Sequence, residues 1–220
     1  MEDKTFNKTK LNTVKRIPKR GSYDKSVIYS ILDSHYLCHI SWEEAGQPFM
    51  IPTAYGRIED KLYIHGSSKS RMLTMLADGR PLCLVVTHLD ALVLARSVFH
   101  HSMNYRSAVI YGHAHQVEGD EKMEALRVIT EQIIPGRWDE ARLPNEIEMK
   151  ATIALAIDID TASAKIRTGP PSDDTVDYDL SIWAGIVPLK HGYDAPITDP
   201  DMKMSLPTDQ SAIELVKKYQ

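Results

Sequence analysis

The sequence predicts a mainly β protein of the α+β class, an antiparallel six-stranded barrel with helices between some of the strands. Six apolar or alternating segments follow one another along the chain. The first three are joined by turns too short for the crossover connections of a parallel sheet. No G-x-G-x-x-G motif follows a strand, which argues against a doubly wound dinucleotide-binding fold.

The first half of the chain predicts a helix and three strands. A helix is expected over about 23–33, because apolar residues recur on one face of that segment. Ser22 is a suitable N-cap for it. Three strands are expected at 36–42, 49–58 and 61–65. Polar turns at 43–47 and 59–60 join them. A short helix follows Arg71, and Gly79 with Pro81 forms its stop signal.

The second half predicts three more strands and two helices. The long apolar runs 81–94 and 105–118 should be neighbouring strands, and 151–166 a last long strand. A helix is expected from about Gly119 to Ile134, with these residues inward: Met123, Leu126, Ile129 and Ile133. After an extended linker, Ser211 and Glu214 resemble a capping box for a C-terminal helix.

Composition bounds the class of protein. The chain has 220 residues, 43% hydrophobic and 25% charged, which is typical of a soluble globular domain. We expect a basic N-terminal arm at 1–20, one main domain at 21–190 and a C-terminal extension at 191–220. A formal charge of −4 argues against nucleic acid as a partner, and we interpret the basic arm as a solvated, partly disordered leader.

The cysteine content and the hydropathy of the sequence indicate the cellular compartment. Cys38 and Cys83 each lie in an apolar run, which is typical of buried thiols in a reducing compartment. The N-terminus lacks the apolar segment of a secretory signal, and no apolar run approaches the length of a membrane span. We therefore expect a cytoplasmic protein without a membrane partner.

The segment from Leu62 to Arg71, LYIHGSSKSR, predicts a phosphate pocket at the end of a strand. Gly66 permits close backbone approach, and the serine hydroxyls are hydrogen-bond donors. Lys69 and Arg71 supply charge that matches a phosphate dianion. The helix that follows would present its unpaired N–H groups to the same anion.

Several separated motifs carry a family resemblance. They are IPTAYG (51–56), YIHGSSKSR (63–71), FHHSMNYRSAVIYG (99–112), RTGPPSDD (167–174) and IWAGIVPL (182–189). In this order they resemble the FMN-binding split-barrel proteins related to pyridoxamine 5'-phosphate oxidase, closest to the flavin-nucleotide-binding subgroup that includes nitroimidazole-resistance proteins. The resemblance implies a homodimer with two FMN molecules at its interface.

The resemblance also implies roles for particular residues. The flavin phosphate would contact Ser68, Ser70 and Arg71, with Lys69 adding charge. The isoalloxazine edge would meet backbone groups of Pro52, Thr53 and Ala54, and His65 would lie near the ribityl chain or the ring. The site would be closed by Asn104, Tyr105, Arg106 and Ser107, and by Trp183 from the other subunit.

Three of these residues have alternative interpretations. Arg106 could pair with a carboxylate across the sheet, a common arrangement for strand arginines. Trp183 could anchor the C-terminal segment. Pro52 indicates an edge strand or a bulge, which occurs with or without a ligand.

The nine histidines raise two further hypotheses. A metal site could use His113 and His115, or His100 and His101, but adjacent strand residues face opposite sides and no carboxylate stands at ligand spacing. We therefore predict no metal. Haem is an alternative cofactor, because split barrels similar to this one bind it through a histidine, and His65 is a candidate ligand.

The sequence thus predicts an FMN-dependent oxidoreductase acting on small organic acceptors such as nitroaromatic or quinone-like molecules. No nucleophile triad stands out, and a flavin needs none. Vitamin B6 oxidation is disfavoured, because Trp183 is followed by apolar residues where that oxidase has arginine and histidine. The alternative is a protein that binds or senses FMN or haem without turnover.

Overall fold

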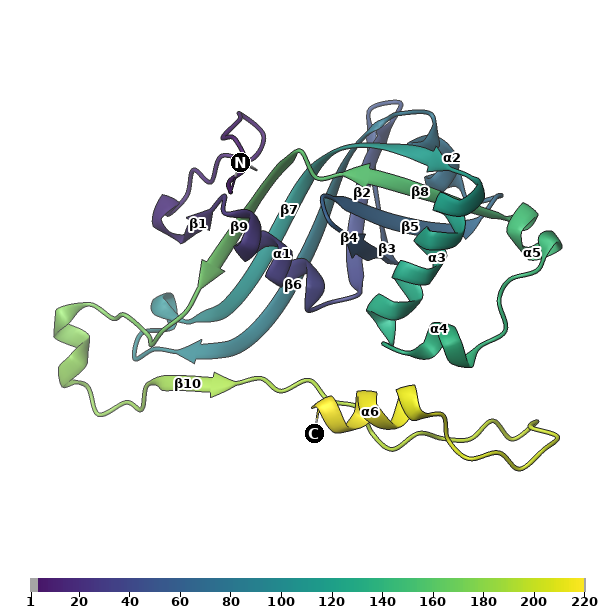
Figure 1. Ribbon diagram of the computed structural model, residues 1–220. Helices are drawn as coiled ribbons and strands as arrows, with labels where there is room; N and C mark the ends of the chain where they lie inside the picture. Colours follow the sequence, from purple (N-terminus) through teal and green to yellow (C-terminus); the bar gives the residue numbers. More distant parts are fainter. Residues whose placement is uncertain (1–3, 220) are drawn as a thin grey trace. The chain divides into compact units, whose positions relative to one another are not determined.

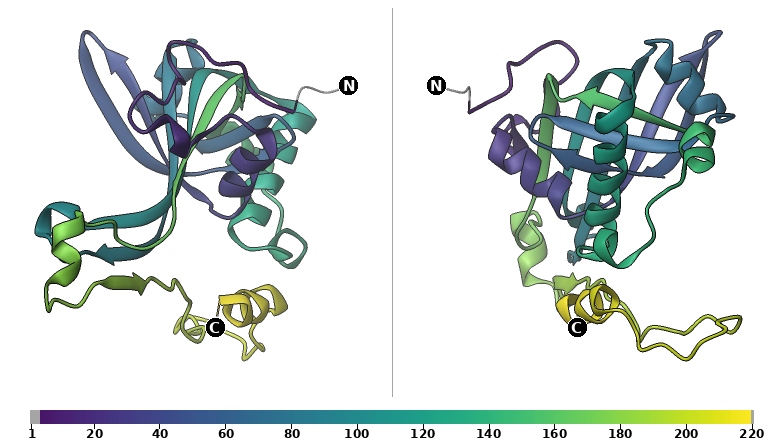
Figure 2. Two further views of the ribbon diagram at one scale, coloured as in Figure 1. Left: turned by 90° about the vertical axis from the view of Figure 1, so that its left-hand side faces the viewer. Right: turned by 45° about the vertical axis from the view of Figure 1, so that its right-hand side comes forward.

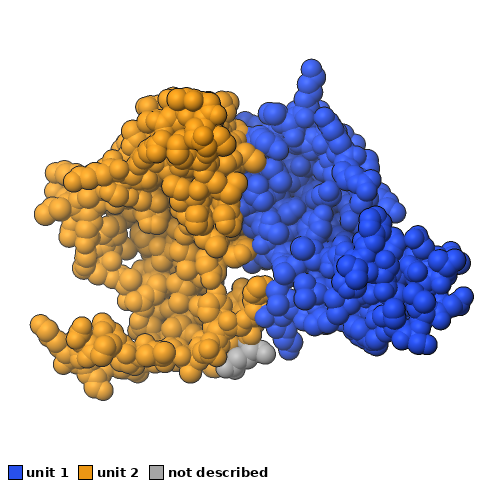
Figure 3. All heavy atoms as spheres, turned by 180° about the vertical axis from the view of Figure 1, so that it is seen from behind, with its two compact units in different colours: residues 1–34, 84–111, 160–190 blue, residues 35–83, 112–159, 191–220 orange. Residues whose placement is uncertain are grey.

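The computed structural model describes residues 4–219. The chain forms two compact units, each assembled from three separate stretches of sequence (Figure 3). Unit 1 takes the described residues of 1–34, 84–111 and 160–190, and unit 2 takes those of 35–83, 112–159 and 191–220. Two long strands run from one unit into the other, so each unit depends on residues distant in sequence.

The described residues contain ten strands, not the six predicted. These strands pair with antiparallel neighbours, as expected. The strands are β1 (Gly21–Ser22), β2 (Leu37–Glu44), β3 (Gln47–Ala54), β4 (Gly56–Ile58), β5 (Lys61–Ser67), β6 (Pro81–Leu94), β7 (Ser102–Val117), β8 (Thr152–Asp158), β9 (Thr161–Arg167) and β10 (Gly185–Pro188) (Figure 1). Their hydrogen-bonded order is β3-β2-β6-β7-β8-β5-β4, with β9 beside β7, β1 beside β9 and β10 beside β6.

The extra strands arise where the chain changes pairing partner. The predicted strand 49–58 divides at Tyr55, because β3 pairs with β2 whereas β4 pairs with β5. The predicted strand 151–166 divides at Ile159 and Asp160, between β8 and β9. Neither break carries a glycine–proline or other strong turn signal between the two strands, so the sequence pattern alone did not reveal them. The remaining two strands, β1 and β10, are short.

In unit 1, helix α1 (Lys25–Asp33) begins later than predicted. Its N-cap is Asp24, whose carboxylate accepts from the Ser26 N–H at 2.8 Å, and Ser22 lies in β1 instead. The helix buries Ile28, Ile31 and Leu32.

The N-terminal arm is fastened to unit 1, contrary to the expectation of a partly disordered leader. Phe6 is buried, and the Asn12 side chain is 2% exposed. The Asn12 Nδ2 donates to the Asn7 carbonyl at 2.9 Å and to the Ala162 carbonyl at 3.0 Å. A short 3₁₀ turn at Pro18–Arg20 then leads into β1. Because the buried Asn12 amide donates to Ala162 of β9, its hydrogen bonds hold the arm beside that strand.

Unit 1 also contains the long hairpin of β6 and β7, with the segment 175–189 beside its end (Figure 2). Strand β10 lies along β6, with Gly185 opposite Leu94 and Pro188 opposite Ala91. Two 3₁₀ turns, η2 (Val98–His100) and η3 (Thr175–Asp179), lie close together here, since His100 pairs with Asp174.

Unit 2 contains the remaining helices. They are α2 (Arg71–Ala77), α3 (Gly119–Ile133), α4 (Arg137–Glu140), α5 (Glu146–Ala151) and α6 (Gln210–Tyr219). The boundaries of α2 and α3 confirm the predicted start and stop signals, whereas α5 was not predicted. No helix in the described part is long and apolar enough to cross a membrane.

The buried face of α3 differs from the predicted one. Met123 and Leu126 are only half-buried, while Lys122, Ala125, Val128 and Ile129 are buried. The reason is a close approach at Gly56 of β4. A Cβ at that position would lie 2.7 Å from the Val128 carbonyl, so only glycine lets the helix backbone reach the strand.

The C-terminal helix α6 is held by a contact that the sequence did not suggest. Ser211 does not form the predicted capping box with Glu214. Its backbone N–H donates to Glu140 at 3.1 Å and its hydroxyl donates to the same carboxylate at 2.5 Å. Tyr193, earlier in the C-terminal segment, shares a 2.8 Å hydrogen bond with the Tyr36 hydroxyl. These contacts attach residues 191–219 to unit 2.

Candidate functional site

The predicted site residues fall into two groups, one in each unit. Unit 2 contains Pro52, Thr53, Ala54, His65, Ser68, Lys69, Ser70 and Arg71. Unit 1 contains Asn104, Tyr105, Arg106, Ser107 and Trp183.

The Ser67–Arg71 turn joins β5 to α2, as predicted. Ser70 is the N-cap of α2, and its hydroxyl oxygen accepts from the Leu73 N–H at 3.4 Å. The Ser70 N–H donates to the Ser67 carbonyl at 2.9 Å, and the Lys69 N–H donates to the Ser67 hydroxyl oxygen at 3.2 Å. These bonds fix the turn. Ser68 and Lys69 are exposed, and Ser70 is half-buried.

Arg71 is held by two residues of the β2–β3 hairpin. Its Nε donates to a Glu44 carboxylate oxygen at 2.9 Å, and its Nη2 donates to the same oxygen. The guanidinium also lies over the Phe49 ring, 4.1 Å from its centroid, and Phe49 stacks on Trp42. Among the described residues Nη1 has no acceptor, so it is available to an anion.

A groove of about 600 Å³ adjoins the same turn. Its wall is formed by Ser68, the end of β7, the first turn of α3, helix α5 and the start of β8. The Ser68 N–H donates to the Ala151 carbonyl at 2.8 Å, and Ser67 stands opposite Thr152. The predicted phosphate turn and the groove are therefore continuous.

Strand β3 is an edge strand that pairs with β2 alone in the described part of the chain. This confirms one of the two interpretations of Pro52. Because the Tyr55 N–H donates to the Tyr36 carbonyl and hydrogen-bonded pairs alternate, Thr53 directs its backbone groups toward β2. Pro52 and Ala54 direct theirs outward. Pro52 thus costs no ladder hydrogen bond. Its outward carbonyl and the outward Ala54 N–H are available to a ligand, whereas the Ala54 carbonyl already accepts from the Thr53 hydroxyl at 3.4 Å.

His65, on β5, has an imidazole without a hydrogen-bond partner for its buried Nδ1 among the described residues. Burial lowers the pKa of this histidine below its usual value. The ring is therefore neutral at physiological pH and can accept a hydrogen bond or ligate a metal.

In unit 1, Arg106 takes the alternative role that the sequence left open. Its Nε lies 3.2 and 3.1 Å from the two Asp90 carboxylate oxygens, and its Nη2 donates to one of them at 2.9 Å. Asn104, 7% exposed, accepts from the Arg167 guanidinium and donates to the Gly169 carbonyl at 3.2 Å. Both side chains are therefore occupied within the unit.

Ser107 and Tyr105 lie on β7 beside β9. The Ser107 hydroxyl donates to the Lys165 carbonyl at 3.3 Å, and Tyr105 stands opposite Arg167. Trp183 is 67% exposed, and its ring covers Gly185, where a Cβ would come within 2.8 Å of it. Gly185 thus lets the Trp183 ring lie against the backbone while one face stays open.

The segment that carries Trp183 is anchored by Asp173. The Asp173 carboxylate accepts from the Arg96 N–H at 2.9 Å, from the Ser97 N–H at 3.1 Å and from the Arg96 guanidinium at 3.2 Å. Burial raises the pKa of this carboxyl, but the hydrogen bonds lower it by more, and the net shift is downward.

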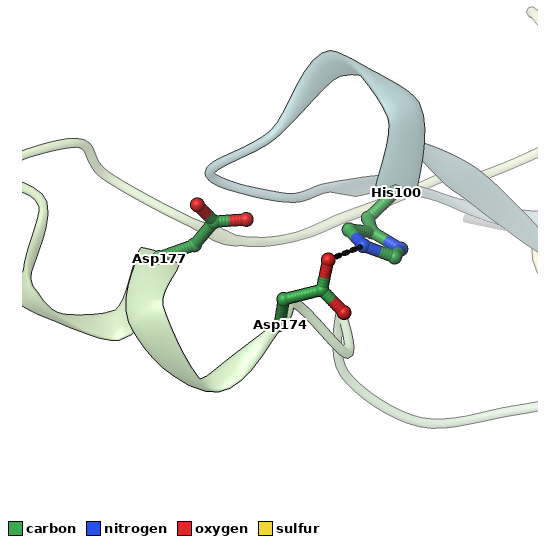
Figure 4. A group of neighbouring side chains, drawn as sticks. All are labelled: His100, Asp174 and Asp177. Carbon is green, nitrogen blue, oxygen red and sulfur yellow. Dashed lines mark ion pairs between the residues drawn. The ribbon is translucent and has the colours of Figure 1, made fainter.

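One histidine lies near two acids in unit 1 (Figure 4). His100 Nε2 lies 3.4 Å from an Asp174 oxygen, and the ligand atoms of His100, Asp174 and Asp177 all lie within 4.8 Å of one another. In the described residues this is the one group of three such side chains. It uses His100, one of the histidines considered from the sequence, with two acids at the start of η3.

The sequence interpretation missed the partners of the predicted residues. Glu44 and Phe49, which hold Arg71, are distant from it in the chain, and no local signal connects them. Helix α5, which forms one wall of the groove, did carry a signal. The Asn145 side chain accepts from the Glu148 N–H and the Glu148 side chain from the Asn145 N–H, a capping box visible as N-x-x-E.

Comparisons with known proteins agree with this fold. Residues 24–166 match the family model described as pyridoxamine 5'-phosphate oxidase. Among curated proteins, none matches the chain significantly.

Two solved structures are similar over nearly the whole chain. The FAD and haem binding protein from Mycobacterium smegmatis is 37% identical, with a TM-score of 0.86 over 90% of this chain and 97% of that one. The flavocytochrome Anf3 from Azotobacter vinelandii is 35% identical, with a TM-score of 0.88 over 94% of this chain and 97% of that one.

A third structure shares the fold at lower identity. It is a putative 5-nitroimidazole antibiotic resistance protein from Bacteroides thetaiotaomicron, 21% identical, with a TM-score of 0.56 over 66% of this chain and 86% of that one. The family model spans more than half of the sequence, and the first two structures exceed the identity at which a shared family is secure. This chain belongs to the pyridoxamine 5'-phosphate oxidase-like family.

Proposed function

We propose that this protein binds a flavin nucleotide and works as a flavin-dependent redox protein. The observation that supports this most is the Ser67–Arg71 turn, in a chain more than one-third identical to two proteins described as flavin-binding or as a flavocytochrome. The turn offers the hydroxyls of Ser68 and Ser70, the unpaired ammonium of Lys69 and the free Nη1 of Arg71 to one phosphate.

The remaining unit 2 residues suit the rest of the FMN moiety, which FMN and FAD share. The outward backbone groups at Pro52 and Ala54 fit the hydrogen-bonding edge of a flat heterocycle. His65 adds a neutral imidazole with an unused Nδ1. A bound flavin supplies the electron transfer, and the protein holds the ring and adjusts its reduction potential through such hydrogen bonds. No further catalytic side chain is required.

The residues that follow Trp183 in the chain indicate the class of substrate. The apolar residues that follow it, from Ala184 to Leu189, favour a weakly charged acceptor of the nitroaromatic or quinone class. We propose FMN-dependent reduction of such acceptors as the activity. Neither Cys38 nor Cys83 is in a disulfide in the described part of the chain, and burial raises the pKa of the Cys38 thiol to about 12. Both observations suit the cytoplasmic location predicted from the sequence.

Reconstitution tests this function directly. The apoprotein is titrated with FMN, and flavin fluorescence and absorbance report binding. The bound flavin is then mixed with a nicotinamide donor under anaerobic conditions, followed by a nitroaromatic or a quinone. Bleaching and reoxidation by the acceptor are expected. If the flavin binds but is never reduced, the protein senses or stores flavin and does not act as a reductase. If no flavin binds, the proposal is refuted.

Haem is a second candidate cofactor, because one similar structure is described as a haem-binding protein and the other as a flavocytochrome. A haem iron needs a neutral imidazole nitrogen, which the buried, unpartnered Nδ1 of His65 offers. A Soret band in the purified protein, lost in His65→Ala while flavin absorbance persists, would assign His65 to haem. Loss of flavin binding alone would assign it to the flavin.

We also propose that the protein is a homodimer through a surface of unit 1. Large apolar side chains are exposed there on two neighbouring turns and the segment after them: Val98, Phe99, Val176, Tyr178, Ile182 and Trp183. Phe99 is 85% exposed, and contiguous apolar surface of this kind is typical of an interface. Sedimentation should give a dimer for the native chain and a monomer for Phe99→Asp with Trp183→Ser. A monomeric native chain would refute the proposal.

A further inference from the structure

We propose that His100, Asp174 and Asp177 form a binding site for a divalent transition-metal ion, of which Zn²⁺ is the expected member. The site lies within unit 1, at two neighbouring 3₁₀ turns. His100 is the last residue of η2, Asp174 is the N-cap of η3, and Asp177 lies within η3. The inference goes beyond flavin binding and does not depend on it. It also replaces the expectation of no metal, because the two acids come from a distant part of the chain.

The spacing of the ligand atoms is the first argument. His100 Nε2 lies 3.4 Å from an Asp174 carboxylate oxygen, and the ligand atoms of all three residues lie within 4.8 Å of one another (Figure 4). Zinc bonds of about 2.0 to 2.2 Å at tetrahedral angles place neighbouring ligand atoms about 3.3 to 3.6 Å apart. The separation of His100 and Asp174 already lies in this range, and the Asp177 carboxylate reaches it by approaching at most about 1.5 Å.

The state of the His100 imidazole is the second argument. Its Nε2 is shielded from solvent and has no hydrogen-bond partner among the described residues, although the Asp174 oxygen lies only 3.4 Å away. The two atoms are therefore close but are not oriented to share a proton. A buried polar atom without a partner is costly, and a cation bound between the imidazole and the carboxylate satisfies both groups.

The balance of charge around the site favours a cation. Neither Asp174 nor Asp177 pairs with a lysine or an arginine within residues 4–219. Arg96 is engaged elsewhere, because its Nη1 donates to Asp173 at 3.2 Å and its guanidinium lies over the Tyr178 ring, 4.7 Å from the centroid. With the imidazole as a neutral ligand, the two carboxylates carry the two negative charges that a divalent ion neutralises.

Contacts outside the ligand set hold both turns in place. The Ser97 hydroxyl oxygen accepts from the Phe99 N–H at 3.3 Å, and the His100 N–H donates to the Ser97 carbonyl at 3.0 Å, which fixes η2. The fully buried Asp173 carboxylate accepts from the Ser97 N–H at 3.1 Å and joins the loop before η3 to η2. Ligands that are positioned before the metal arrives lose little conformational freedom when it binds.

The ligand set selects the class of metal. An imidazole nitrogen suits Zn²⁺ and other first-row transition metals, whereas Mg²⁺ and Ca²⁺ prefer oxygen ligands. No cysteine belongs to the group, so sulfur ligands are not expected. Three protein ligands leave the fourth tetrahedral position to a water molecule. The bound ion would join η2 to η3, the two turns that carry part of the proposed dimer surface.

The test titrates the full-length protein, first freed of metal with a chelator, with Zn²⁺ by calorimetry and with Co²⁺ by visible absorption. One ion per chain is expected. The Co²⁺ spectrum should be that of a four-coordinate site with nitrogen and oxygen ligands, without a sulfur-to-metal band. Asp174→Asn and Asp177→Asn keep the shape of the side chains and should each weaken Zn²⁺ binding by at least about tenfold, since even residues behind metal ligands contribute that much.

Asp179→Asn is the matched control. It removes an exposed carboxylate of the same turn that is not part of the group, and it should leave the Zn²⁺ affinity unchanged. Circular dichroism should show that the variants fold as the native chain does. The site is overturned if no stoichiometric binding occurs, if the native chain and the variants bind equally, or if a sulfur-to-cobalt band appears. Each of these results leaves the flavin proposal standing, because the titrations contain no flavin.

Discussion

The guanidinium of Arg71 is paired with the carboxylate of Glu44 through two nitrogens on one oxygen. This arrangement leaves Nη1 without an acceptor among the described residues, and the Phe49 ring supports the guanidinium from one side. An arginine held in this way presents a fixed donor to a ligand, because less side-chain freedom is lost on binding. Glu44 is therefore a positioning residue for Arg71.

Arg71→Ala should weaken flavin binding by about 1.5 to 3 kcal/mol, the usual contribution of a charge-assisted hydrogen bond. Titration of the apoprotein with FMN measures the effect. Unchanged affinity would remove the phosphate from the Ser67–Arg71 turn.

Glu44→Gln separates positioning from stability. The Arg71 side chain is 56% exposed, so solvent screens the ion pair and the free energy of unfolding should change by less than about 1 kcal/mol. Flavin affinity should nevertheless fall, by less than in Arg71→Ala. An affinity that rises in Glu44→Gln would mean that Glu44 competes with the phosphate and does not position Arg71.

Gly56→Ala should destabilise unit 2 by about 1 to 3 kcal/mol, the usual cost of overpacking. The added methyl group would lie 2.7 Å from backbone atoms of Val128 and Ile129, and a helix backbone cannot move aside as a flexible side chain can. Urea denaturation measures the change. Gly112→Ala is the matched control, because its nearest neighbour is at 3.4 Å, and a similar loss in both variants would contradict the explanation.

The burial of His65 predicts a dependence of stability on pH. Its pKa is lowered in the folded state, so the unfolded chain binds the proton more readily. Stability is therefore complete above the unfolded pKa of about 6.5 and is lost as the pH falls toward the folded value. His65→Gln should reduce the difference in unfolding free energy between about pH 7.5 and about pH 5.5. His191→Gln, which replaces an exposed histidine, should leave that difference unchanged. Equal effects of the two substitutions would contradict the prediction.

Asp173→Ala should release the segment that carries Trp183. The carboxylate accepts from two backbone N–H groups and one guanidinium, and alanine would leave those donors without their partner. Limited proteolysis should cut the 170–184 segment faster in the variant, whereas Asp174→Ala should have little effect. Equal cleavage rates in the native chain and Asp173→Ala would show that other contacts hold the segment.

The sequence by itself determined the features that depend on neighbouring residues. The turn predicted within 43–47, the helix that begins after the Ser67–Arg71 turn and its stop at Gly79 follow from local backbone preferences, and the structure confirms them. The family could also be recognised, since short motifs in a fixed order need no coordinates. The antiparallel pairing followed from loop length.

Only the tertiary structure decided the features that depend on residues brought together from a distance. The strand breaks at Tyr55 and Ile159 follow from a change of pairing partner, and the inward face of α3 follows from its close approach to Gly56. Glu44 beside Arg71 and Ala151 beside Ser68 are pairs that no local pattern specifies. The periodicity of apolar residues indicates which side chains are buried. The residue that pairs with a given charged side chain depends on how distant parts of the chain pack together.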